Sequence, residues 1–251
     1  MSSIKTARPA ILIAHTRSGG TFLAHCLSTH PDIFCPRGEP LLPSHSWRKA
    51  LPHVSSTAIL GCILHAFNYE VGMCRITYVQ TNVEVFDYLR SVEALVILLE
   101  RENLLRCAVS QTIMNMTSRG EIEYPLHTEH TTEIPGVTLH PLVVLERCRW
   151  QAEWQKRMHV DTRASKLRTL RLTYAEIVGG EMVNAERLTL QSTERICSFL
   201  RVVQYPMTSS LRAVAPRPLS SIVANWDELK AVICDSEFAR YLEEEAGEEK
   251  K

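Results

Sequence analysis

The sequence predicts a single α/β domain in which helices flank a central parallel β-sheet. Short runs of continuous apolar residues are typical of strands that are buried on both faces. The stretches between these runs have the apolar spacing of helices. Strands that alternate with helices favour right-handed βαβ crossovers and therefore a parallel sheet. With 251 residues, the chain is long enough to bury a core without a metal or disulfide.

The first predicted strand covers residues 10–14, the apolar run Ala-Ile-Leu-Ile-Ala. A turn with two glycines, residues 16–21, separates this strand from a helical pattern over residues 22–28. The next buried-strand run covers residues 94–99, and a helix is predicted over residues 103–115. The chain thus contains two strand–turn–helix units of the kind from which parallel sheets are built.

A third strand is predicted at residues 167–172, where leucines alternate with polar or basic residues as in a strand near a sheet edge. Residues 116–139 and 206–218 show no period, and an irregular segment as long as the first is typical of a lid or of disorder. The predicted domain covers residues 1–242, and residues 243–251 are expected to form an acidic tail, the frayed and solvated end of a helix. Further helical patterns occur at residues 82–89, 141–159, 192–200 and 226–232.

Composition excludes several classes of protein. The formal net charge is zero, and even without the acidic end it is about +3, which does not favour nucleic-acid binding. The eight cysteines include no C-x-x-C pair, so we expect neither a metal site nor a disulfide framework. There is no signal-peptide pattern and no apolar run of about 18 residues. We therefore expect a cytoplasmic protein that does not enter a membrane. The sequence leaves its oligomeric state open, and a homodimer is one of the alternatives.

The glycine turn has the features of an anion-binding site. Backbone N–H groups at a helix start attract negative charge, and glycines let the backbone wrap closely around it. Arg17 adds a guanidinium, and Ser18 and Thr21 add hydroxyl donors. The turn lacks the lysine and the first glycine of the ATP-binding loop G-x-x-x-x-G-K-[ST]. A plain strand–helix turn is the alternative interpretation.

Four blocks in order resemble the PAPS-dependent sulfotransferases, with the small bacterial trehalose-sulfotransferase-like branch as the best match. The first is residues 11–23, followed by Ser-Thr-His-Pro at 28–31 and Gly-Glu-Pro at 38–40; the second is residues 99–110, similar to the R-x-x-x-x-x-x-x-V-S element. The third, residues 172–177, resembles a Y-E-D-L turn, and the fourth comprises residues 216–219 and 225–229. The resemblance implies a phosphate-binding-loop architecture and the cofactor 3′-phosphoadenosine-5′-phosphosulfate (PAPS), whose product is PAP.

The resemblance also assigns binding residues. Residues 17–21 (Arg17, Ser18, Gly19, Gly20 and Thr21) would hold the 5′-phosphosulfate, and Phe22 is a further cofactor-binding residue. Arg101 and Ser110 would hold the 3′-phosphate, with either Arg212 or Arg217 as a further contact, and Tyr174 would lie near the adenine. The alternatives are a surface ion pair of Arg101 with a neighbouring glutamate and a core position for Tyr174.

In-line sulfuryl transfer requires positioning, charge stabilisation and a base. Arg17 would stabilise charge on the leaving phosphate, although arginine cannot donate a proton at neutral pH. The resemblance makes Glu39 the candidate general base, and a solvated loop carboxylate is its alternative role. Relatives often carry a lysine where this chain has Ile63, and the sequence leaves open whether His65 replaces it.

The acceptor is predicted only as a class of molecule. Acidic residues and histidines populate the irregular segment 116–139 and its end, which favours a polyol or a cationic small molecule over an acidic glycan. The resemblance implies a sugar or a natural product, such as an alkaloid, as the small-molecule acceptor. A small-molecule kinase with an atypical phosphate loop and a non-catalytic nucleotide-binding module are the competing functions. The residues concerned are Glu121, Glu123, Glu129, Glu133, His127, His130 and His140.

Overall fold

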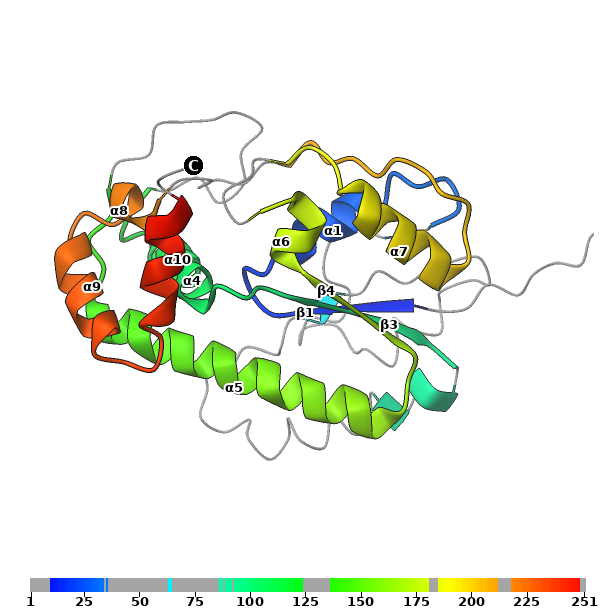
Figure 1. Ribbon diagram of the computed structural model, residues 1–251, viewed down its shortest axis with the longest axis horizontal. Helices are drawn as coiled ribbons and strands as arrows, with labels where there is room; N and C mark the ends of the chain where they lie inside the picture. Colours follow the sequence, from blue (N-terminus) through cyan, green and yellow to red (C-terminus); the bar gives the residue numbers. More distant parts are fainter. Residues whose placement is uncertain are drawn as a thin grey trace, which may run out of the picture.

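The structure is a computed structural model. Its described residues are 10–33, 35, 63–64, 86–87, 89–91, 93–123, 136–180, 185–211 and 218–248. Within these ranges four parallel strands form one sheet flanked by helices, which confirms the predicted α/β class (Figure 1). The strands are β1 (Ala10–Ala14), β2 (Ile63–Leu64), β3 (Leu95–Glu100) and β4 (Thr169–Thr173), arranged in the order β2-β1-β3-β4.

The two central strands are apolar except for Glu100 at the end of β3, because helices cover both faces of the sheet (Figure 1). Every residue of β1 and of β3 is buried. In β4, by contrast, only Leu172 is buried, as expected for the strand at the edge beside β3. The alternating pattern of this segment therefore predicted its edge position correctly.

The strand order creates a switch point at β1. From β1 the chain continues to β2 on one side of the strand, whereas β3 pairs with β1 on the other side. Connections that diverge in this way leave a crevice at the carboxyl ends of the strands, where open α/β sheets bind ligands. The segments that leave β1 and β3 flank this crevice, and they contain the first two sequence blocks.

One face of the sheet carries α1 (Gly20–Leu27), α6 (Tyr174–Val178) and α7 (Leu190–Leu200). Side chains of these helices pack with alternate residues of β1 and β3 into one apolar cluster, of which Leu23, Ile177 and Ile196 are fully buried members. This packing fixes α1 against the sheet and thereby fixes the turn between β1 and α1.

The other face is crossed by the long helix α5 (Pro141–Ser165), which extends past the end of the sheet (Figure 1). There it packs against α4 (Leu104–Ser118), α8 (Leu219–Ile222), α9 (Trp226–Cys234) and α10 (Arg240–Glu248) in a second apolar cluster. None of the helices in the described ranges is long and apolar enough to cross a membrane.

The structure differs from the sequence prediction at the C-terminal end. Residues 240–248 form α10, and Glu245 within it is only 3% exposed. The expectation of a solvated tail from residue 243 is therefore wrong at this position, because the Glu245 carboxylate meets a buried arginine on α4. The predicted helix over residues 82–89 is represented by helical residues at 86–87 and 89–91.

Candidate functional site

The turn between β1 and α1 is held in an uncommon backbone conformation. Gly19 has φ +91° and Arg17 has φ +66°, both in the left-handed region that side chains generally avoid. The Ser18 hydroxyl donates to the His15 carbonyl oxygen at 2.7 Å, and the Ser18 N–H donates to the same oxygen at 3.2 Å. Ser18 thus closes the turn with its hydroxyl proton, which corrects the expectation that this proton is offered to an anion.

The start of α1 presents N–H groups that could donate to an anion at this turn. The first intrahelical hydrogen bond runs from the Leu23 N–H to the Gly19 carbonyl, so the N–H groups of Gly20, Thr21 and Phe22 have no acceptor within the helix. The helix dipole adds positive potential at the same end. The Thr21 side chain is exposed and can donate from its hydroxyl.

The second sequence block reaches this turn through α4. The Arg17 Nε donates to the Ser110 Oγ at 2.8 Å, although the two residues are far apart in the sequence. Arg101, which directly follows β3, donates from Nη1 to the Arg17 carbonyl at 3.4 Å. Because the Ser110 oxygen accepts from Arg17 and its proton has no acceptor among the described residues, Ser110 can donate to an anion bound between the two arginines.

The third block places Tyr174 against the same turn. A capping box at the start of α6, between Thr173 and Glu176, fixes the entry to this helix. The Tyr174 ring lies so close to Gly19 that a Cβ there would be 2.5 Å from its Cδ2 atom. The Arg101 guanidinium stacks over this ring, with its Cζ 4.4 Å from the centroid. Tyr174 is therefore both a core residue, 8% exposed, and a wall of the site.

His15 and Gln155 form hydrogen bonds that connect the site to α5. The sequence did not predict this role of Gln155. The His15 ring donates from Nδ1 to the Thr16 carbonyl at 2.9 Å, so Nε2 is the acceptor for the Gln155 amide at 3.0 Å. The same amide nitrogen donates to the Arg101 carbonyl at 2.9 Å. Gln155 on α5 thus joins the ends of β1 and β3, and no sequence motif marks a glutamine for such a bridge.

The neighbouring glutamate Glu100 is engaged elsewhere. Its carboxylate pairs with His159 on α5 and with Arg171 on β4, which lies 3.3 Å away. These contacts connect the end of β3 to both of its neighbouring elements. These contacts do not support the alternative interpretation, in which Arg101 forms a surface ion pair with Glu100.

The structure therefore brings six predicted residues from three sequence blocks into contact around the turn, next to the N–H groups of Gly20, Thr21 and Phe22 at the start of α1. Glu39, His65, Arg212 and Arg217 lie outside the described residues. Phe22 is partly buried and packs against the first apolar cluster. The residues that meet at the turn are Arg17, Ser18, Gly19, Arg101, Ser110 and Tyr174.

The buried cysteines are unsuited to nucleophilic chemistry. Burial raises the pKa of Cys26, Cys35 and Cys148 to about 12, so all three remain protonated thiols at neutral pH. They behave as small apolar side chains, as their positions in apolar stretches of the sequence predict.

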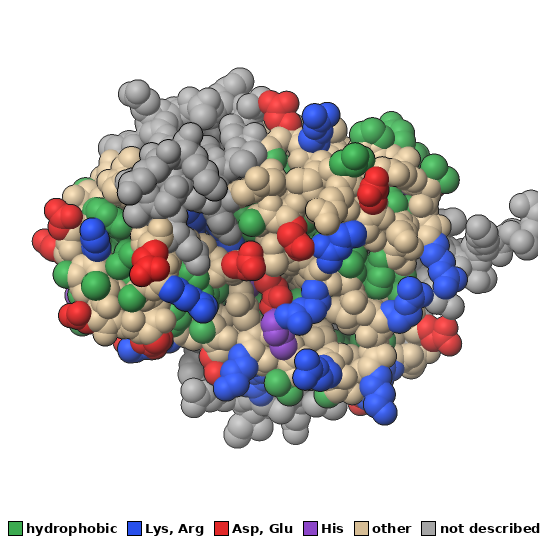
Figure 2. All heavy atoms as spheres, viewed as in Figure 1, with side chains coloured by type: hydrophobic (Ala, Val, Ile, Leu, Met, Phe, Trp, Pro, Cys, Tyr) green, Lys and Arg blue, Asp and Glu red, His purple; other side chains and the backbone are tan. Residues whose placement is uncertain are grey.

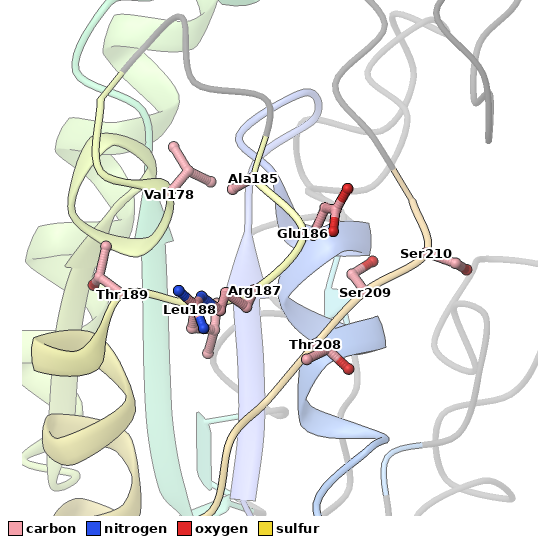
Figure 3. A pocket seen from close by; sticks show the side chains of 9 residues that line it. All are labelled: Val178, Ala185, Glu186, Arg187, Leu188, Thr189, Thr208, Ser209 and Ser210. Atoms are coloured by element: carbon pink, nitrogen blue, oxygen red, sulfur yellow. The ribbon is translucent and has the colours of Figure 1, made fainter.

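A cavity of about 680 Å³ lies between the segments 185–189 and 208–210, next to Val178 at the end of α6 (Figure 3). The Thr208 N–H donates to the Thr29 hydroxyl, just beyond the last residue of α1. Glu186 and Arg187 give the cavity mixed charge, and hydroxyl groups line much of the rest. Acidic and basic side chains are interspersed over the face drawn in Figure 2.

No protein-family model and no curated protein matches this sequence. Two solved structures resemble the chain: a sulfotransferase from Alicyclobacillus acidocaldarius and mouse sulfotransferase SULT7A1 complexed with PAP, each 16% identical. The first has a TM-score of 0.48 and covers 94% of this chain and 93% of its own. The second has a TM-score of 0.44, with coverage of 96% and 89%. Similarity at this level does not transfer an activity, so the function of this chain depends on what its own residues can bind.

The contact between Gly19 and Tyr174 predicts the effect of adding one methyl group. Gly19→Ala and Gly120→Ala both force alanine into left-handed backbone, but a Cβ at Gly120 meets nothing within 4 Å. We expect both variants to lose about 1–2 kcal/mol of unfolding free energy from backbone strain. Gly19→Ala should lose about 1–3 kcal/mol more from overlap with the Tyr174 ring.

Urea denaturation of both glycine variants measures this difference. Combining Gly19→Ala with Tyr174→Ala should recover the additional loss, as a double-mutant cycle would show. Equal losses in the two single variants would mean that the close contact between Gly19 and the ring does not exist in solution.

Proposed function

We propose that this protein is a sulfotransferase that transfers the sulfuryl group of PAPS to a hydroxyl of a small polar acceptor. One observation supports this proposal above the others: the Arg17–Ser110 hydrogen bond joins the first two sequence blocks in one site at the switch point of the sheet. The third block adds Tyr174 to the same site. A cluster of helix N–H groups, two guanidiniums and a hydroxyl suits a ligand with two separate phosphate groups.

The described residues divide between the two ends of such a ligand. The N–H groups of Gly20 and Thr21, together with the Arg17 guanidinium, would hold the 5′-phosphosulfate at the start of α1. Arg101 and the Ser110 hydroxyl would hold the 3′-phosphate, and Tyr174 would contact the base. PAPS supplies the activated sulfuryl group when it is bound. The fixed positive charge of the α1 N-terminus and of Arg17 would stabilise the negative charge that develops on the departing phosphate.

The acceptor hydroxyl requires a base, for which we propose Glu39. Its Gly-Glu-Pro context is the observation that supports this role. A carboxylate that removes a proton at neutral pH needs burial or a nearby negative charge to raise its pKa. We propose a sugar or a natural product such as an alkaloid as the acceptor, because acidic residues are abundant in the segment 116–139.

Ligand-induced stabilisation distinguishes this function from a kinase. We expect PAP at about 100 times its Kd to raise the Tm by roughly 5–10 °C without magnesium. ATP should give no comparable shift, with or without magnesium, because it has no 3′-phosphate for Arg101 and Ser110. Thermal unfolding followed by circular dichroism measures both shifts. Stabilisation by ATP with magnesium, and none by PAP, would favour the kinase instead.

The assignment of the 3′-phosphate contacts predicts a selective loss of affinity. Arg101→Gln and Ser110→Ala should each weaken PAP binding by about 10- to 100-fold, since a hydrogen bond to a charged group contributes about 1.5–3 kcal/mol. Their affinity for 5′-AMP, which lacks the 3′-phosphate, should fall much less, by about two- to fivefold, because only their contacts with Arg17 and Tyr174 are lost. Isothermal titration calorimetry measures both affinities.

Arg119→Gln is the matched control for these two variants, because Arg119 pairs with Glu121 on the surface at the far end of α4. It should bind both nucleotides as the wild type does. If Arg101→Gln weakened 5′-AMP as much as PAP, this residue would not be the contact to the 3′-phosphate.

The role of Glu39 as the base is tested by turnover measurements. These require an acceptor, which is first identified by screening hydroxyl compounds for sulfation. Glu39→Gln should lower kcat by about two orders of magnitude, the size of a general-base contribution, and leave PAP affinity unchanged. Glu102→Gln, an exposed glutamate beside Arg101, serves as the control and should retain activity. Unchanged turnover in Glu39→Gln would assign the base to another residue, with His65 as the next candidate.

A further inference from the structure

Glu245 on α10 is a buried carboxylate that no sequence motif marks. Glu245 and Arg106 on α4 are both 3% exposed, and they form a bidentate pair: Arg106 Nε lies 2.6 Å from Oε1 and Nη2 lies 2.7 Å from Oε2. Two further donors reach the same carboxylate, the Asn103 amide at 3.2 Å and the Leu219 N–H at 3.2 Å. Ordinary packing of a C-terminal helix does not require a buried charge with this many donors.

Two elements, α4 and α8, supply the donors to this carboxylate, and α4 also carries Ser110 of the candidate site. Asn103 is the N-cap of α4, where its side chain accepts from the Arg106 N–H at 3.0 Å, and it follows Arg101 by two residues. Arg106 lies one turn before Ser110 on the same helix. Leu219 begins α8, directly after the segment that contains Arg212 and Arg217.

We propose that Glu245 is a positioning residue for the half of the site that would hold the 3′-phosphate. Its carboxylate fixes the start of α4, and with it the placement of Arg101 and Ser110 relative to the turn at Arg17. This inference rests on the proposed function, because it names what the positioned residues bind.

A buried ion pair can also serve stability alone, and the variants are chosen to separate the two roles. Glu245→Gln leaves the Arg106 charge buried without its partner, and this variant could fail to fold. The double replacement Arg106→Met with Glu245→Met removes both charges, a change that is often neutral or stabilising. It nevertheless deprives Asn103 and Leu219 of their shared acceptor. Glu243→Gln, an exposed glutamate on the same helix, is the matched control.

Titration calorimetry with PAP and with 5′-AMP, well below the Tm of each variant, provides the test. We expect the double variant to bind PAP about 3- to 30-fold more weakly, the range for a residue that acts through its neighbours, with 5′-AMP affinity unchanged. Hydrogen exchange should show that PAP protects residues 218–222 and 240–248 in the wild type and in Glu243→Gln but not in the double variant.

The outcomes separate the inference from the proposed function. If the wild type binds PAP and the double variant binds it equally well, Glu245 is purely structural and the inference is overturned alone. If the wild type does not bind PAP, the proposed function fails and this inference fails with it. A loss of PAP affinity in the double variant, with wild-type affinity in Glu243→Gln, supports the positioning role.

Discussion

The parallel pairing of β1 with β3 is the constraint on which the site depends. The last pair of this ladder is Ala14 with Leu99, so the two chains leave the sheet side by side, about 5 Å apart. Residues just beyond the strand ends, Arg17 and Arg101, therefore come within hydrogen-bond reach although they are far apart in the sequence. A different strand order would separate them by at least one strand width and leave no shared site.

Buried polar contacts maintain this arrangement at the edges of the apolar core. Gln155 joins the ends of the two central strands, a capping box orients α6, and the Arg106–Glu245 pair attaches the C-terminal helix to the start of α4. Each contact removes polar groups from water, a cost that directional hydrogen bonds offset. Apolar packing alone would hold the helices and strands together but would fix their relative positions less exactly. Binding an anion requires hydrogen-bond donors that are placed to within a fraction of an ångström.

Local sequence signals were sufficient for the parts of the fold that depend on nearby residues. The apolar runs at 10–14 and 94–99 predicted buried strands, and the glycine turn predicted a strand–helix junction, because these preferences act within a few residues. The helix over residues 103–115 was also predicted, with Asn103 as its first residue and now its N-cap. The expected solvated tail was wrong at Glu245, since its glutamate-rich sequence gives no sign that one carboxylate meets an arginine 139 residues earlier.

The sequence by itself therefore determined the α/β class and the strand–turn–helix junction at the glycine turn, which follow from local composition and spacing, whereas the resemblance to the sulfotransferases supplied the candidate binding residues. Only the tertiary structure decided that Arg17 bonds Ser110 and that Tyr174 packs on Gly19. It also decided that Gln155 joins the ends of β1 and β3 and that Glu245 pairs with Arg106. These contacts join residues that are distant in the chain, and the strand order and helix packing that create them depend on the whole fold. No window of the sequence contains that information, because a residue's long-range partner has no effect on its local conformational preference.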